Sequence, residues 1–245
     1  MQAPTAYRLS PTAYRKIAVF RTLYLGDLLL AVPALRALRA GFPEAEITLI
    51  GLPWAASFAR RFHRYVDRFV EFGGYPGIDE VAVDPGRSAH FVEEQRAYRY
   101  DLVVQMQGSG RTSNPCALAL GGRMTAGYYD GEPPPGLTFG APYPDDQPEV
   151  LRNVGLIRLL GCPHRGLELE FPLVARDRAE AAELLTPHPP VPSPSRGEGE
   201  RAAFPLPRTG SGAGGEGSAS PLPCQGEGPG AARWPTASRA RRARG

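Results

Sequence analysis

Residues 16–51 read KIAVFRTLYLGDLLLAVPALRALRAGFPEAEITLIG, and this stretch decides the fold. Its first six residues are mostly apolar, which is typical of a buried strand. A turn through Gly26 follows, and residues 27–39 carry apolar side chains at helical spacing until a Gly-Phe-Pro sequence ends the helix. Residues 46–51 form a second apolar run. The stretch therefore predicts strand, helix and strand, which is the βαβ unit of a parallel sheet.

The alternation continues to residue 186. Strands are expected at residues 66–72, 101–106 and 123–128, helices at 54–65, 88–98, 149–160 and 176–185, a short helix after a loop at 107–114, a proline-rich loop at 132–148 and a last structured piece at 167–174. Strands that alternate with helices predict an α/β fold with a doubly wound parallel sheet, Rossmann-like in type, over residues 16–186.

The composition changes abruptly after this region. Residues 187–245 contain 11 Pro and 11 Gly and almost no apolar clusters, so we expect a disordered, low-complexity tail there. The tail repeats the pattern P-x-P-x-x-G-E-G, which we interpret as a translated DNA repeat, the alternative being a linker or a ligand for an SH3-like domain. Residues 1–15 repeat Pro-Thr-Ala-Tyr-Arg and are expected to form a flexible leader.

Composition also excludes several classes of function. The net charge is only +3, and the basic residues outside the tail are mixed with acids, so nucleic acid is not the expected partner. The three cysteines, Cys116, Cys162 and Cys224, are too far apart to suggest a disulfide framework or a metal site. The longest apolar run, residues 28–35, is short of the roughly 20 residues that span a membrane. Together with the lack of a secretory signal, this predicts a cytoplasmic protein.

The turn at residues 21–30, RTLYLGDLLL, carries the most chemical information. It places a carboxylate where the first strand ends, and open α/β sheets bind ligands at that edge. The glycines of a dinucleotide fold and the Gly-Lys pair of a P-loop are both missing, so no nucleotide cofactor is expected at this turn. Asp27 has two interpretations. It could cap the helix, stabilising it by about 1 kcal/mol, or act as a general base, typically a 100- to 10,000-fold effect. The spacing alone favours the cap.

Four segments resemble glycosyltransferase family 9, the ADP-heptose:lipopolysaccharide heptosyltransferases. KIAVFR, LGDLLLAVPALRALR and FPEAEITLI resemble the opening of that family, and DLVVQMQGSGRTSNP at residues 101–115 resembles the stretch after its fourth strand. The segments occur in family order within residues 16–186. The resemblance implies the N-terminal, acceptor-side half of a GT-B enzyme, which uses no metal or cofactor and takes a nucleotide-sugar, ADP-heptose, as co-substrate.

The resemblance also implies roles for particular residues. Asp27 matches the family's catalytic base, which would activate an acceptor hydroxyl. Thr22 and Gly26 would line the same cleft and contact the acceptor, with Gly26 allowing a tight turn. Arg111, after the central strand, could hold a phosphate or carboxylate of the acceptor. A solvated surface arginine is the competing interpretation of Arg111.

The expected reaction is transfer of heptose, or a related sugar, from an ADP-activated donor to a lipopolysaccharide core acceptor. Because a donor-binding half is not recognisable after residue 186, we expect this chain to be inactive by itself; the alternative is a non-catalytic acceptor-binding remnant of a disrupted gene. The basic, aromatic helix at residues 54–65 could also bring the protein to the anionic inner face of the inner membrane, although an ordinary solvated helix explains it equally well.

Overall fold

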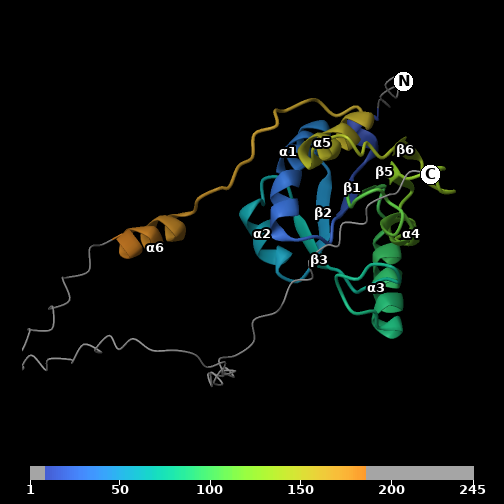
Figure 1. The fold of residues 1–245 in the computed structure, drawn as a ribbon, viewed down its shortest axis with the longest axis horizontal. Coiled ribbons are helices and arrows are strands. Elements are labelled where there is room, and N and C mark those ends of the chain that lie inside the picture. The colour runs from blue at the N-terminus through green and yellow to red at the C-terminus, as the bar shows by residue number, and fades with distance from the viewer. Residues whose placement is uncertain (1–8, 186–245) are drawn as a thin grey trace, which may run out of the picture. The chain divides into compact units, whose positions relative to one another are not determined.

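The computed structural model describes residues 9–185, which are drawn in colour in Figure 1. Six parallel strands form one sheet in this part of the chain, in the order β3-β2-β1-β4-β5-β6. The strands are β1 (Lys16–Phe20), β2 (Glu46–Gly51), β3 (Arg68–Glu71), β4 (Leu102–Gln105), β5 (Met124–Tyr129) and β6 (Phe139–Pro142). This is the strand order of a Rossmann-type sheet, so the predicted fold class is confirmed.

Helices cover both faces of the sheet. The covering helices are α1 (Leu25–Gly41), α2 (Ala55–Arg61), α3 (Pro85–Tyr98), α4 (Ser113–Ala119) and α5 (Glu149–Leu159), after a short 3-10 turn η1 (Pro11–Ala13). Helix α6 (Ala175–Leu185) has no buried residue and does not cover the sheet. Helices α1, α2 and α5 contribute to one hydrophobic cluster, and α3 and α4 contribute to the other. The described helices are too short or too polar to cross a membrane.

Strand β1 shows how the two faces arise from the sequence. Residues 17–20 of this strand are buried, and alternate side chains point to opposite faces. Ile17 and Val19 join the cluster under α1 and α5, whereas Ala18 and Phe20 join the cluster under α3 and α4. A strand with helices on both sides is mostly apolar, which explains the apolar run at residues 17–20 that predicts it.

The structure differs from the sequence-based expectation at three places. Strand β6 lies inside the segment predicted as a proline-rich loop, and it is an edge strand, where proline is tolerated because one side of the ladder needs no donor. Helix α2 ends at Arg61, four residues earlier than predicted. Residues 167–174 form neither helix nor strand.

Two predicted segments fall largely outside the described residues. The predicted tail at 187–245 and residues 1–8 of the predicted leader are among those that the structure does not describe. The rest of the leader contacts the domain. Tyr14 is buried, and its ring meets the ring of Phe42 edge to face at 5.6 Å.

Both cysteines in the described part of the chain are free and buried. Cys116 lies in the cluster under α3 and α4, and Cys162 packs directly against Gly41, where a side chain would find no room. Burial raises the pKa of each thiol to about 12. Both side chains therefore act as small apolar groups in the core.

Candidate active site

The carboxyl ends of β1 and β4 lie side by side in the middle of the sheet. From here the chain order runs outward to β3 on one side and to β6 on the other, so this is the switch point at which open α/β sheets bind ligands. Residues 21–27 follow β1, and residues 106–112 follow β4. These two connections contain the four predicted site residues, Thr22, Gly26, Asp27 and Arg111.

A buried arginine organises this edge of the sheet. Arg21 is only 1% exposed. Its Nε donates to the backbone oxygen of Asp27 at 3.1 Å, and its Nη1 donates to the backbone oxygen of Met106 and to Oδ1 of Asn153. Its Nη2 donates to Oε1 of Glu149 at 3.0 Å. One guanidinium therefore ties the ends of β1 and β4 to the first turns of α1 and α5.

Charge is balanced around this arginine. Burial lowers the pKa of Arg21, and the charge and hydrogen bond of Glu149 oppose that effect. Burial raises the pKa of Glu149, but the hydrogen bonds and charges of Arg152 and Arg21 outweigh it and hold the pKa below its usual value. Arg152 donates from Nε and Nη2 to Oε2 of Glu149, at 3.0 and 2.6 Å. Glu149 thus stays ionised between two guanidinium groups.

Asp27 lies in the first turn of α1, above Arg21. The helix begins at Leu25 with Tyr24 as its N-cap, so Asp27 is the third helical residue and not the cap that the spacing favoured. Its Oδ2 still accepts the N–H of Tyr24 at 3.3 Å, which satisfies one free donor of the helix start. The side chain is partly exposed. The carboxylate can therefore support the helix and face solvent at the switch point.

Gly26 is not required for a tight turn, contrary to expectation. It is an exposed helical residue that is absent from the glycines with positive φ, and a β-carbon added there would meet no atom within 4 Å. Glycine here leaves open space beside Asp27.

Thr22 is buried under the turn. Its N–H and its hydroxyl both donate to Oε1 of Gln107, each at 2.8 Å. The amide nitrogen of Gln107 in turn donates to Oε1 of Glu80 at 3.2 Å. Thr22 therefore fixes the connection after β1 to the connection after β4, and its hydroxyl is occupied by the protein.

Arg111 is exposed and forms an ion pair with Asp130, at the end of β5. Both residues line a hollow of about 200 Å³, together with Tyr129 and Glu132. A guanidinium that already has a carboxylate partner binds a second anion less readily, because the two anions compete for the same donors. Arg111 is thus at the predicted edge, but with a partner that the sequence did not reveal.

The loop after β4 rests on a polar core. The amide nitrogen of Gln105 donates to the backbone oxygen of Gln107 and to Oγ of Ser113, and the amide nitrogen of Asn114 donates to the backbone oxygen of Tyr128 at 2.8 Å. Oε1 of Gln105 and Oδ1 of Asn114 are buried without a hydrogen-bond partner. Ser113 and Asn114 therefore hold the loop in place from within, through hydrogen bonds to the backbone oxygens of Gln107 and Tyr128.

Gly127→Ala is expected to destabilise the domain by about 1–3 kcal/mol. A β-carbon at this position would lie 3.0 Å from Oε1 of Gln105 and 3.0 Å from Oδ1 of Asn114. Neither side chain can retreat without breaking the bonds that hold the loop. Equilibrium unfolding in urea measures the effect. Gly131→Ala is not a matched control because its φ is positive, whereas Gly26→Ala has free space and should cost far less.

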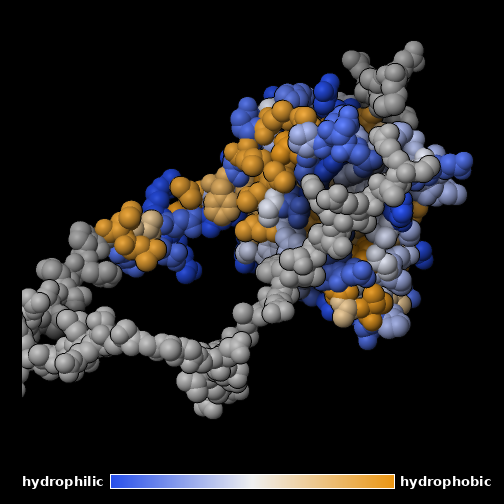
Figure 2. Space-filling model, viewed as in Figure 1, coloured by the Kyte–Doolittle hydropathy of each residue, from blue (hydrophilic) through white to orange (hydrophobic). Residues whose placement is uncertain are grey.

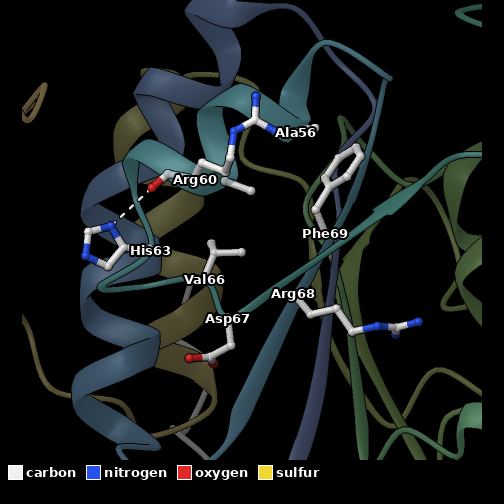
Figure 3. Close-up of a pocket in the computed structure, with 8 residues that line it drawn as sticks. Ala56, Arg60, His63, Val66, Asp67, Arg68 and Phe69 are labelled. Atoms are coloured by element: carbon white, nitrogen blue, oxygen red, sulfur yellow. Dashed lines mark hydrogen bonds between the residues drawn. The ribbon is translucent and has the colours of Figure 1, made fainter. Parts of the chain in front are cut away.

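A second hollow lies elsewhere, between α2 and the edge strand β3. It measures about 300 Å³ and is lined by Ala56, Ala59, Arg60, His63, Val66, Asp67, Arg68 and Phe69 (Figure 3). Figure 3 shows the side chain of Arg68 pointing away from the hollow and His63 bonded to the backbone oxygen of Arg60. None of the predicted site residues lines it, so we do not assign the site there.

The arginines of α2 and the following turn are partly neutralised within the domain. Arg61 pairs with Asp177, and Arg64 pairs with Glu170. Arg60 is exposed. In the described residues no group of three His, Cys, Asp or Glu side chains could hold a metal ion.

Comparison with solved structures identifies the fold. A glycosyltransferase family 9 protein from Veillonella parvula matches 73% of this chain with a TM-score of 0.57 and 18% sequence identity. The chain has the fold of one half of a family 9 glycosyltransferase. ADP-heptose lps heptosyltransferase II from E. coli matches 69% of this chain with a TM-score of 0.50 and 15% identity. This chain spans 50% of the length of each.

No protein-family model matches the sequence, and no curated protein matches it significantly. The family 9 fold is therefore shown by structural similarity. Two residues that organise its switch point escaped the sequence-based prediction. Arg21 follows an apolar run, and Glu149 opens a helix 128 residues later, so only the folded chain brings them together.

Proposed function

We propose that this domain is the acceptor-side half of a sugar transferase of the family 9 type. The reaction is transfer of heptose, or a related sugar, from an ADP-activated donor to a lipopolysaccharide core acceptor. The observation that carries the proposal is the position of Asp27. It is a partly exposed carboxylate beside open space, on the first turn after β1, at the switch point of the sheet.

In this proposal Asp27 is the general base. It removes the proton of an acceptor hydroxyl, which then attacks the anomeric carbon of the donor sugar with inversion, and the ADP group leaves. Arg21 fixes the backbone of Asp27 but does not touch the acceptor. Gly26 and Arg111 border the acceptor, and Thr22 acts from below through Gln107. No metal or cofactor takes part.

Residues 1–245 are expected to bind the acceptor without catalysing transfer of a sugar to it. The solved structures with this fold are about twice as long as the matching part, so the domain supplies one wall of a cleft. Positioning of the donor and stabilisation of the departing diphosphate then have to come from another half. A purely acceptor-binding role is the second candidate, and the half-length match is the observation that favours it. In either role we place the domain in the cytoplasm, at the inner face of the membrane, with Arg60 free to contact anionic lipid.

The test combines binding with turnover. Titration of the ¹⁵N-labelled chain with core oligosaccharide should shift amide signals of residues 22–27 and 107–111, and should leave residues 63–69 of the second hollow unchanged. ADP release from ADP-heptose should be absent for the chain alone and should appear when its domain is joined to the donor-binding half of the E. coli enzyme. Binding without rescued release would support the acceptor-binding role, and loss of both would refute the proposal.

A further inference from the structure

The segment that follows α5 is attached to the domain mainly by ion pairs. Residues 163–177, which we call the exit strap, run from the end of α5 to the first turn of α6, and residues 163–174 have no helix or strand. None of its residues is buried. Leu169, Phe171 and Leu173 are each about half exposed, at 52%, 48% and 57%. Figure 2 shows hydrophobic side chains open to solvent beside α6. The ring of Phe171 meets the buried ring of Phe62 edge to face, with the centroids 6.2 Å apart. The other large apolar side chains of the exit strap bury little surface, so apolar burial contributes only in part to holding it.

Arginines of the domain also hold the exit strap. Arg61 donates to both carboxylate oxygens of Asp177, with Nη2 to Oδ1 at 2.9 Å, and to the backbone oxygen of Pro172 at 2.7 Å. The same guanidinium lies over the ring of Phe171, 4.5 Å from its centroid. Arg61 thus holds the carboxylate of Asp177 with two parallel donors, a geometry that strengthens an ion pair.

A second anchor forms around Glu170. Arg64 pairs with one carboxylate oxygen, and Nη1 of Arg36 lies 3.6 Å from the other. Arg36 also donates to the backbone oxygen of Glu168 at 3.1 Å. Two anchors of arginine and carboxylate, seven positions apart on the strap, thus hold it on α1, α2 and the turn after α2.

We propose that the exit strap is an electrostatic clasp, closed by Arg36, Arg61 and Arg64 on Glu168, Glu170 and Asp177, which opens as ionic strength rises. Partly exposed ion pairs weaken when salt shortens the Debye length, from about 10 Å at 0.1 M to about 3 Å at 1 M. Contacts made by half-exposed apolar side chains are not weakened by salt in the same way. Arg61 and the N–H of Val174 hold the pKa of Asp177 at about 2, so salt is the effective way to open the clasp at ordinary pH. This inference rests on the domain's own contacts and is independent of the proposed function.

Backbone ¹⁵N relaxation of the full chain tests the clasp. At about 0.1 M salt, order parameters of residues 167–177 should approach the rigid value of about 0.85, and at about 1 M salt they should fall below about 0.6. Arg61→Gln should produce the same fall at low salt. Arg87→Gln is the matched control, because Arg87 pairs with Glu71 on the other side of the sheet and does not contact the strap.

The strands of the sheet report whether each variant is folded, since their order parameters should stay high throughout. Two outcomes would overturn the clasp. Residues 167–177 could remain rigid at high salt and in Arg61→Gln, which would mean that apolar contacts hold the strap. They could also be flexible in the unmodified chain at low salt, which would mean that the arginine pairs do not hold it.

Discussion

Arg21→Met should lower the free energy of unfolding by about 3 kcal/mol. The substitution keeps most of the side-chain volume but removes every donor. The backbone oxygen of Met106 and Oδ1 of Asn153 lose a buried partner, and Glu149 loses one of its two guanidinium groups. We take the lower end of the range for a broken buried ion pair because Arg152 still neutralises Glu149. Arg21→Lys should be nearly as damaging, since one ammonium group cannot reach all four acceptors of the guanidinium.

Equilibrium unfolding in urea measures this difference as a shift of the midpoint at constant slope. Arg87→Gln is the control: Arg87 and its partner Glu71 are each about half exposed, at 48% and 49%, so this substitution should change stability by less than about 0.5 kcal/mol. If Arg21→Met lowered the free energy of unfolding by less than about 1 kcal/mol, the hydrogen bonds of Arg21 would not be important for the stability of the switch point.

The effect of Arg21→Met should also depend on pH. The pKa of Glu149 lies below its usual value in the folded chain, so its ionised form stabilises the fold above the unfolded pKa, about 4.3, and this contribution is lost as pH falls through the folded pKa. The stability gap between the unmodified chain and Arg21→Met should therefore narrow as pH is lowered from about 6 to about 3. A gap that stays constant would assign the effect to neutral hydrogen bonds instead of charge.

Asp27→Asn should abolish most turnover in an active two-half enzyme, by about 100- to 10,000-fold in kcat. The amide cannot accept a proton from the acceptor hydroxyl, but its oxygen can still accept the N–H of Tyr24. Unfolding stability should therefore fall by no more than about 1 kcal/mol, the value of one charge at a helix start. The measurement is ADP release by the hybrid of this domain with the E. coli donor half.

Asp130→Asn provides the contrast for Asp27→Asn. It removes the negative charge that pairs with Arg111 at the same edge of the sheet without touching the first turn of α1. The kcat should therefore change little, while affinity for an anionic acceptor should rise because Arg111 loses its competing anion. If Asp27→Asn retained full kcat, the carboxylate would be only a support for the helix start, as its hydrogen bond to Tyr24 allows.

The parts of the fold that follow from the sequence are those with strong periodicity. Strand β2 occupies residues 46–51 as predicted, because a strand covered on both faces is mostly apolar, as Ile47, Leu49 and Ile50 show. Strand β6 has only four residues, Phe-Gly-Ala-Pro, of which two are buried, so neither alternation nor an apolar run marks it. Its pairing with β5 decides its structure, and that pairing joins residues more than ten positions apart.

The sequence predicts where the candidate site lies, but not which side chains hydrogen-bond to one another to build it. A carboxylate after the first strand indicates the switch point, and Asp27 lies there. An arginine directly after a strand is normally expected at the surface. Arg21 is instead buried because Met106, Asn153 and Glu149 arrive from distant parts of the chain with matching acceptors. Likewise, nothing local indicates that Arg111 meets Asp130.

The two buried thiols are expected to be unreactive while the domain is folded. A thiol attacks disulfides and alkylating reagents only as the thiolate, and with pKa values raised to about 12 almost none of Cys116 or Cys162 is in that form at neutral pH. Modification of either residue therefore has to wait for the surrounding helices to separate. Cys162 packs on Gly41, where α5 meets α1. An alkylating reagent is therefore expected to modify Cys162 only when those two helices separate.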